Sequence, residues 1–374
     1  MKQPSILVLI SYRVFPALMG GQKCIASFYQ ELHQHCKVKL IVSKDNDLKA
    51  TNGLDIEDFL YNHWNGFANI QYLFRLLKII KTNQCQYLII EHSYFGWLGY
   101  LIQLLSKTPF IIRVHNIEAH RFRDLNRNGW KLYYYYEKWI CKRADKLWFT
   151  SPNDMVWMQE NWKISNEKCM ALPYGIDITS ATTYIEKQAC RSILLDKFTL
   201  NSYSKLFLFN GTLDYLPNTD AIRIIITELL PRLSKQTKGF RIFVCGNRIT
   251  EQWEKELQKH PEIIYTGFVK DISTYFKGTD CFINPVTLGS GLKTKLVEAL
   301  SYNQDIISVV SGAKGIEETY SGKKIKLVAD YDWDAFVHEM MSNNLPSKND
   351  TPEIFYTDFN WKHIVEKALL SIQS

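Results

Sequence analysis

The chain has 374 residues, of which 46% are hydrophobic and 22% charged, and its formal net charge is +7. This composition excludes a largely disordered chain, and the length predicts two domains of ordinary size. The eight cysteines are scattered, with no C-x-x-C pair and no histidine cluster at metal spacing. Neither a disulfide framework nor a zinc site is supported, so we expect reduced thiols and a cytoplasmic protein.

The first half of the chain is the basic half. Residues 1–150 hold 20 Lys and Arg against 11 Asp and Glu, and ten of those cations lie between Lys107 and Lys146. The first apolar run, residues 6–11, lacks the small-residue cleavage site of a signal peptide, so it predicts a strand instead. The most apolar window, 87–105, contains Glu91 and His92, which favours a strand and a packed helix over a membrane span.

Taken in order, residues 1–173 alternate between apolar runs and amphipathic stretches. This alternation predicts a parallel, doubly wound sheet. We expect strands at 6–10, 38–43, 87–91, 110–114, 147–151 and 170–173, and helices at 22–35, 67–82, 95–106 and 152–161.

Two polar loops interrupt this first half. Gly20 and Gly21 end a long loop before a helix that should start near Gln22. The glycine pair is interpreted either as a simple turn or as a phosphate-facing loop. Asp45-Asn46-Asp47 mimics a metal-binding D-x-D, but a solvated acidic loop is the favoured interpretation.

The segment 111–118, IIRVHNIE, places polar residues after a buried strand. His115, Asn116 and Glu118 then stand at the carboxyl end of that strand, where open α/β sheets bind their ligands. A structural histidine is the competing interpretation.

From Arg121 to Trp148, basic and aromatic residues interleave. One helix with a packed aromatic face is the favoured reading. Nucleic-acid binding is an alternative without a supporting motif, and docking on an anionic membrane or a lipid-linked acceptor is a third.

A polar stretch to about residue 203 is expected to serve as linker and first-helix region, and a second alternating region follows it. We expect strands at 205–210, 241–246, 263–266, 281–283 and 305–310, helices at 271–277 and from 293, and a final amphipathic helix at 361–372. Loops at Gly211 and at Gly267-Phe268-Val269 should lie at strand carboxyl ends.

The most informative stretch runs from residue 280 to 317. A short strand is followed by Gly289-Ser290-Gly291 and a helix that begins near Lys293. Free amides at a helix N-terminus, together with the helix dipole, favour an anion there. Lys293 and Lys295 add positive charge.

The same helix carries Glu298 one turn beyond Thr294, about 6 Å along the axis. A carboxylate there is placed to accept hydrogen bonds from ribose hydroxyls beside a bound phosphate. Alternatively, Lys295 and Glu298 form a surface ion pair at i,i+3 spacing.

The run GSGLKTKLVEAL, followed by a strand and by GAKGIE, resembles the donor-site segment of the family 4 glycosyltransferases of the GT-B fold, of the bacterial polysaccharide and glycolipid type. The R-x-H-N-x-E segment resembles their acceptor-side motif. The family's earlier glutamate of the donor motif is replaced here by Ser290.

This resemblance implies an α/β protein with two doubly wound Rossmann-like domains that face each other across a cleft. Residues 1–180 would form the acceptor-side domain, onto which a helix at 358–374 crosses back, and residues 181–357 the domain that binds the nucleotide sugar. It implies catalytic roles for His115, Lys293 and Lys295, acceptor-side roles for Asn116 and Glu118, no metal, and donor binding by Gly20, Gly21, Gly211, Val269, Gly289, Ser290, Gly291, Leu292, Thr294 and Glu298.

The implied reaction is transfer of a sugar, with retention, from a UDP- or GDP-linked donor to a glycan or lipid-linked acceptor in cell-surface polysaccharide or glycoconjugate synthesis. No cofactor beyond this co-substrate and no nucleic-acid partner are expected. The basic segment 107–146 suggests peripheral contact with an anionic membrane at its inner face. Alternatives are a nucleotide-sugar epimerase of the same fold and a non-enzymatic sugar- or nucleic-acid-binding protein.

Overall fold

The computed structural model describes residues 3–51, 53–237, 239–289, 292–342 and 345–373. The chain forms two compact units, residues 1–175 with 361–374, and residues 176–360. The two units meet in sequence at Gly175/Ile176 and Asn360/Trp361, close to the expected boundaries at 180 and 357.

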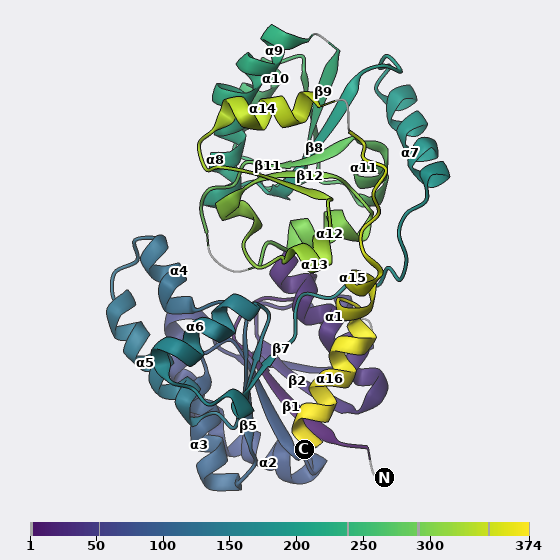
Figure 1. The fold of residues 1–374 in the computed structure, drawn as a ribbon. Coiled ribbons are helices and arrows are strands. Elements are labelled where there is room, and N and C mark those ends of the chain that lie inside the picture. The colour runs from purple at the N-terminus through teal and green to yellow at the C-terminus, as the bar shows by residue number, and fades with distance from the viewer. Residues whose placement is uncertain (1–2, 52, 238, 290–291, 343–344, 374) are drawn as a thin grey trace. The chain divides into compact units, whose positions relative to one another are not determined.

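The first unit is built on a seven-stranded parallel sheet with the order β3-β2-β1-β4-β5-β6-β7. Strands β1, β2, β5 and β7 of this sheet are labelled in Figure 1. Its inner strand β1 is buried on both faces along Ile6–Ile10, which is why its sequence is an unbroken apolar run. The strands are β1 Ser5–Ile10, β2 Lys37–Ser43, β3 Asp55–Leu60, β4 Tyr87–Glu91, β5 Phe110–Val114, β6 Lys146–Phe149 and β7 Cys169–Ala171.

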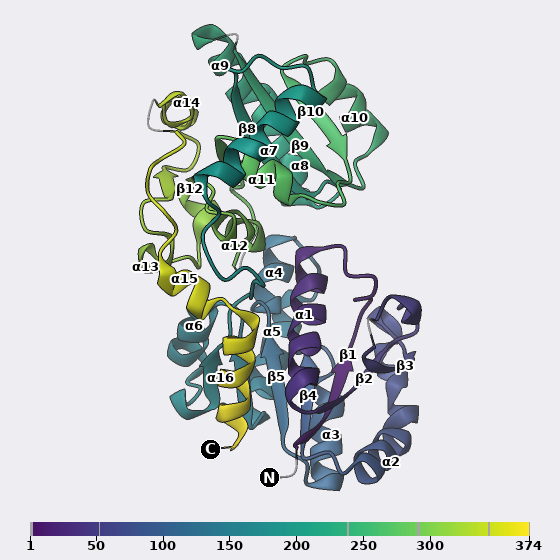
Figure 2. The same ribbon diagram turned by 90° about the vertical axis from the view of Figure 1, so that its right-hand side faces the viewer.

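Helices cover both faces of this sheet. On one face α1 and the C-terminal α16 lie side by side (Figure 2), and the ring of Phe28 in α1 meets that of Trp361 in α16 at 6.4 Å. On the other face α2, α3, α5 and α6 share one apolar core with the sheet. The helices are α1 Gly20–His35, η1 Leu48–Ala50, η2 His63–Tyr72, α2 Leu73–Asn83, α3 Gly96–Ser106, α4 Glu118–Asp124, α5 Trp130–Arg143, α6 Pro152–Trp162, η3 Asn166–Lys168 and α16 Trp361–Gln373.

Two features of the first unit differ from the sequence-based expectation. Strand β3 was not predicted, because it is an edge strand whose polar residues pair across to β2; Lys39 lies 2.9 Å from both Asp55 and Glu57. The segment 121–148 is not one helix. A turn with left-handed residues at Asn126 and Gly129 separates α4 from α5.

The second unit contains a six-stranded parallel sheet with the order β10-β9-β8-β11-β12-β13. Its inner strands are again continuous apolar runs, buried on both faces. The strands are β8 Lys205–Thr212, β9 Phe240–Asn247, β10 Ile263–Gly267, β11 Cys281–Asn284, β12 Ile306–Val309 and β13 Ile325–Val328.

The helices of the second unit complete the doubly wound arrangement. A continuous helical stretch from α8 through η4 to α9 changes to π geometry just before Pro231, whose missing N–H interrupts the regular hydrogen bonding. The helices are α7 Tyr184–Lys197, α8 Leu216–Ile224, η4 Ile225–Leu229, α9 Leu230–Gln236, α10 Glu251–Gln258, α11 Ser273–Gly278, α12 Thr294–Ser301, η5 Val310–Ala313, α13 Glu318–Ser321, α14 Trp333–Met341 and α15 Glu353–Asp358.

Because all strands within each sheet run parallel, their carboxyl ends gather along one edge of that sheet. This edge is where polar side chains of either unit are brought together. Within the described residues, none of the helices has both the length and the apolar character needed to cross a membrane.

Candidate active site

In the first unit, three neighbouring strands deliver polar rings to the same edge of the sheet. Tyr12 follows β1, His92 follows β4 and His115 follows β5, and these strands are adjacent in the order β1-β4-β5. The two imidazoles stack with centroids 4.3 Å apart and planes inclined by 16°. The predicted site residue His115 is therefore one member of a cluster.

Glu91, the last residue of β4, is the buried charge at the centre of this cluster. It accepts hydrogen bonds from Arg113 Nη1 at 3.2 Å and from the Tyr29 hydroxyl, and His115 Nε2 lies 2.6 Å from its Oε2. Burial by itself would raise the pKa of Glu91, but the opposing charge of Arg113 and contact with His115 bring it down to about 2. Glu91 is therefore ionised at neutral pH.

The protonation of His115 follows from this contact. Burial, with His92 alongside, lowers the pKa of His115 to about 4 despite the nearby Glu91, so the imidazole is neutral near pH 7. Because the Glu91 carboxylate only accepts, Nε2 must carry the proton and Nδ1 must present its lone pair. A neutral imidazole in this tautomer accepts a hydrogen bond from a ligand hydroxyl.

His92 was not predicted as a site residue. Its backbone has φ +60, a left-handed conformation that non-glycine residues rarely adopt and that concentrates at functional sites. Its Nε2 lies 2.9 Å from the Tyr12 hydroxyl and its Nδ1 lies 3.1 Å from Glu118 Oε1. The rule that singled out His115, a polar residue directly after a buried strand, applies equally to His92 after β4.

The predicted acceptor-side residues Asn116 and Glu118 lie at the start of α4. The Glu118 carboxylate is buried and receives hydrogen bonds from Tyr94 and from Arg121 Nη1, the latter at 2.6 Å. Burial opposes ionisation, yet contact with His92 and the charge of Arg121 hold the pKa of Glu118 below its usual range. With its oxygens engaged in this way, Glu118 positions His92.

A second buried carboxylate, Glu137 of α5, fixes the first turn of α4. It accepts hydrogen bonds from the backbone N–H of Glu118 at 3.1 Å and of Ala119 at 2.9 Å, and from the Ser93 hydroxyl at 2.8 Å. Burial raises the pKa of Glu137 to about 8. Sequence alone gave no signal for it, because Glu137 lies in the middle of a basic, aromatic helix.

Gly20 and Gly21 form the first turn of α1 rather than the end of the preceding loop. A Cβ atom on Gly21 would meet nothing within 4 Å, so there is open space beside it. The side chain of Asn46 accepts hydrogen bonds from the N–H groups of Val14 and Phe15 at 2.7 and 2.8 Å. The Asp45-Asn46-Asp47 segment thus fastens the loop that leads to α1.

In the second unit, the loop after β11 leads into α12, which begins at Thr294. Lys293 is the N-cap residue, and its ammonium group donates to the carbonyl of Gly289 at 2.9 Å. Gly289 has a φ of +90°, a left-handed conformation that favours glycine at this position. Ser290 and Gly291 lie outside the described residues.

Lys295 extends from the first turn of α12 toward the end of β8. Its Nζ donates to Asn218 Oδ1 at 2.7 Å, and Asn218 Nδ2 in turn donates to the carbonyl of Thr212 at 2.9 Å. Burial and then the charge of Lys293 lower the pKa of Lys295 to about 7, against the opposing effect of Glu298. Because burial disfavours the charged ammonium form of this side chain, an anion bound beside it would stabilise that form.

Gly211 permits this arrangement. A Cβ atom there would lie 2.6 Å from Asn218 Nδ2, and a Cβ on the adjacent Gly246 would lie 2.0 Å from the carbonyl oxygen of Gly211. Both positions therefore require glycine for β8, β9 and Asn218 to approach one another. Asn218 was not predicted; it lies 77 residues before Lys295.

The other predicted donor residues surround the same edge. Leu292 precedes α12 and packs beside Gly315, where a Cβ atom would meet Leu292 Cδ1 at 3.3 Å. Glu298 lies half-buried in the second turn of α12. Val269 lies in the loop between β10 and α11. The structure thus brings Gly211 at the end of β8, Gly289 in the loop after β11 and Lys295 in the first turn of α12 to the carboxyl edge of one sheet.

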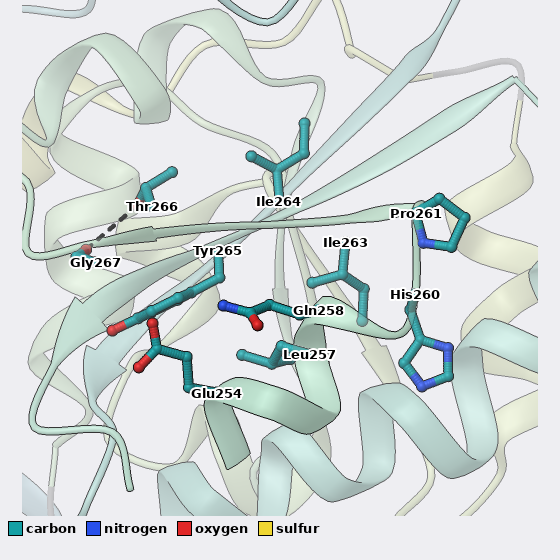
Figure 3. Close-up of a pocket in the computed structure, with 10 residues that line it drawn as sticks. All are labelled: Glu254, Leu257, Gln258, His260, Pro261, Ile263, Ile264, Tyr265, Thr266 and Gly267. Carbon is teal, nitrogen blue, oxygen red and sulfur yellow. Dashed lines mark hydrogen bonds between the residues drawn. The ribbon is translucent and has the colours of Figure 1, made fainter. Parts of the chain in front are cut away.

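A hollow of about 560 Å³ lies apart from these residues, between α10 and the edge strand β10 (Figure 3). Leu257, Gln258 and Tyr265 are among its lining residues. None of the predicted site residues lines it. In the described part of the chain, no three His, Cys, Asp or Glu side chains are grouped so that they could hold a metal ion.

The two parallel, doubly wound sheets, each with polar residues at its carboxyl edge, define a Rossmann-like α/β protein of the GT-B class. Two family models match the chain, Glycosyltransferase Family 4 over residues 19–180 and Glycosyl transferases group 1 over residues 204–342. The chain belongs to the family 4 glycosyltransferases of the GT-B fold.

Solved structures agree with this fold. Sucrose-phosphate synthase from Thermosynechococcus elongatus superimposes with a TM-score of 0.74 at 15% identity, over 99% of this chain and 98% of that one. Anabaena Alr3699/HepE, in complex with UDP and glucose, gives a TM-score of 0.73 at 13% identity, over 99% and 100%. The predicted fold is therefore confirmed.

A protein of Klebsiella pneumoniae, described as an uncharacterized 44.6 kDa protein in cps region, is 23% identical over 267 residues. The match covers 68% of this chain and 65% of that protein. The chain thus spans somewhat less than two thirds of the length of this relative.

Proposed function

We propose that the protein is a glycosyltransferase that moves a sugar from a nucleotide-sugar donor, UDP- or GDP-linked, to a glycan or lipid-linked acceptor. The observation that carries this proposal is the start of α12, where Lys295 is partly buried and held by Asn218 beside the cationic N-cap residue Lys293. This is a site for a phosphorylated ligand. Family membership and the UDP and glucose bound to the similar Alr3699/HepE support a nucleotide sugar as that ligand.

In this proposal the second unit stabilises the leaving group. As the bond between the sugar and the diphosphate breaks, negative charge grows on the diphosphate oxygens. The N-terminus of α12 and one of Lys293 and Lys295 would neutralise that charge, which is catalysis by preorganised electrostatics. Glu298 would accept hydrogen bonds from the ribose hydroxyls.

The first unit would receive the acceptor. His115 is neutral and presents Nδ1 as a hydrogen-bond acceptor, so it is suited to orient a sugar hydroxyl. Retention at the anomeric carbon is the stereochemistry we propose from the family resemblance, without a named enzymic nucleophile. A setting in cell-surface polysaccharide or glycoconjugate synthesis is supported by the relative described as lying in a cps region.

Thermal denaturation with a panel of UDP- and GDP-sugars tests the donor. A bound donor at 100 times its dissociation constant should add about 2.7 kcal/mol to the free energy of unfolding, whereas the free sugars should add nothing. No stabilisation by any nucleotide sugar, nucleoside diphosphate or nucleotide would contradict the proposal.

A second assay separates transfer from other activities. The stabilising donor is incubated with and without a glycan or lipid-linked acceptor, and the products are identified. A new glycoside that forms only with acceptor supports transfer, and its anomeric configuration decides retention. An altered nucleotide sugar formed without acceptor would indicate an epimerase, and tighter binding of an oligonucleotide than of the nucleotide would indicate a nucleic-acid-binding protein.

A further inference from the structure

Helix α3 of the first unit presents an uncharged outer surface. Its sequence, GWLGYLIQLLS, contains no charged residue. Gly96, Leu98, Gly99 and Ile102 face the core, yet Leu104 and Leu105 remain 49% and 60% exposed. A helix that is apolar all round is expected to be covered on its outer side as well.

Helix α5, which packs against α3, carries a second exposed apolar row. Leu132, Tyr135 and Trp139 are 77%, 70% and 38% exposed. At 100° per residue these three positions lie on the side opposite the buried Glu137 and Ile140. The row therefore lies outside the buried core.

The same pattern appears on the other side of α3. The η2–α2 segment exposes Phe67, Ile70 and Phe74, the last to 80%. Their spacing of three and four residues places them on one side of the helical stretch. Helix α2 packs against α3, as α5 does, and the three helices can be followed in Figures 1 and 2.

Ring contacts join these three rows into one surface. Phe67 stacks on Trp97 of α3 at 6.0 Å, and Tyr100 of α3 meets Trp139 of α5 at 5.5 Å. We call this surface the apolar face; it consists of Phe67, Ile70, Phe74, Trp97, Tyr100, Leu104, Leu105, Leu132, Tyr135 and Trp139.

Cations surround the apolar face. Arg143 lies 4.2 Å from the ring centre of Trp139. The only acidic residue within α2, α3 and α5 is Glu137, which is buried. The positive residues within the same three helices are Arg75, Lys78, Lys81, Lys131, Lys138, Lys142 and Arg143.

We propose that the apolar face is a docking surface for a bilayer that contains anionic lipids. Exposed aromatic and leucine side chains enter the boundary between headgroups and acyl chains, and flanking lysines are attracted to the negative surface. A second copy of the chain fits less well, because a two-fold interface would bring the same seven cations against one another. The inference does not depend on the proposed transfer reaction.

Flotation of the full-length protein with vesicles tests this inference. Vesicles of phosphatidylcholine alone are compared with vesicles that also contain phosphatidylglycerol, at low and at physiological salt, without any donor. We expect flotation with the anionic vesicles only, and less of it as salt increases.

Two sets of variants locate the contact. The triple variant Leu104→Asp/Leu132→Asp/Tyr135→Asp should bind at least ~10-fold more weakly, because it removes apolar insertion and adds negative charge. The matched control places the same change at exposed residues of the second unit, Ile185→Asp/Tyr203→Asp/Leu327→Asp, and should float like the unchanged protein. Lys78→Gln/Lys138→Gln/Lys142→Gln should reduce binding by ~10-fold or more, and Lys235→Gln/Lys326→Gln/Lys348→Gln should not.

Thermal melting of every variant establishes that it is folded, and the lysine set keeps the test available if the aspartate set unfolds. Equal flotation with neutral and with anionic vesicles would overturn the proposal. So would control sets that reduce flotation as much as the corresponding variants of the apolar face. A dimer in light scattering that the apolar triple variant converts to a monomer would also overturn it, in favour of a second copy.

Discussion

The Nε2 atom of His115 lies 2.6 Å from Oε2 of Glu91, and both side chains are buried. The contact joins a predicted site residue to a charge that also neutralises the fully buried Arg113. One carboxylate therefore sets the tautomer of His115 and compensates a buried cation. The two roles can be separated by mutation.

The Glu91→Gln variant should lose stability. Arg113 would remain buried without a negative partner, which typically costs about 3–5 kcal/mol. Urea unfolding measures the loss. The control is Glu57→Gln, which breaks partly exposed ion pairs with Lys39 and Arg75 and should cost less than about 1 kcal/mol. Equal losses in the two variants would contradict the role assigned to Glu91.

The His115→Ala variant should retain its fold and lose turnover. The Glu91–Arg113 pair survives the change, and we expect activity to fall by a factor of ~10² or more, as when a positioned polar or acid–base group is removed. Nucleotide affinity should change little, because we assign the nucleotide to the second unit. Activity, melting temperature and nucleotide affinity are measured on one preparation, with the exposed His33→Ala as control. A destabilised variant with normal specific activity would return His115 to a structural role.

Lys295 should make nucleotide affinity depend on pH. Its pKa is lowered to about 7 in the free protein, and a bound diphosphate favours the ammonium form. Affinity for UDP should therefore fall as pH rises from about 7 to 9, by up to ~10-fold per pH unit. In the free protein the sign is opposite: stability rises with pH over this window, because the unfolded chain holds the extra proton.

Calorimetric titration with UDP across this range measures the slope. The Lys295→Met variant should bind weakly with little slope, whereas Lys293→Met should keep the slope. If both variants bind and turn over like the unchanged protein, the phosphate assignment at the start of α12 is wrong.

The Glu298→Gln variant should weaken nucleotide binding by about 1.5–3 kcal/mol, the range for hydrogen bonds to a charged group. A deoxyribose analogue of the nucleotide should bind the unchanged protein and the variant with similar affinity. The analogue already lacks the hydroxyl that would bond to the Glu298 carboxylate, so removing the carboxylate's charge costs nothing more. The control is the exposed Glu318→Gln in α13. Unchanged affinity for the ribonucleotide in a folded Glu298→Gln variant would refute the assignment.

The sequence by itself determined the elements whose signal is local. Strand β1 is a continuous apolar run because both of its faces are buried, and the helix that begins at Thr294 shows its glycine loop, lysines and leucine stripe within a dozen residues. Alternation of such elements was sufficient to predict parallel, doubly wound sheets. The edge strand β3 was missed because its polar residues face solvent and pair with β2, so no apolar run marks it.

Only the tertiary structure decided which distant residues meet. The sheet order β1-β4-β5 places Tyr12, His92 and His115 together, and the approach of β8 to α12 joins Asn218 to Lys295 across 77 residues of sequence. The lowered pKa values of Lys295 and His115 likewise arise first from burial, which a sequence does not display. The outward direction of Leu132 and Tyr135 on α5 follows from what packs on the opposite side of that helix, because an amphipathic pattern does not state which side the core will cover.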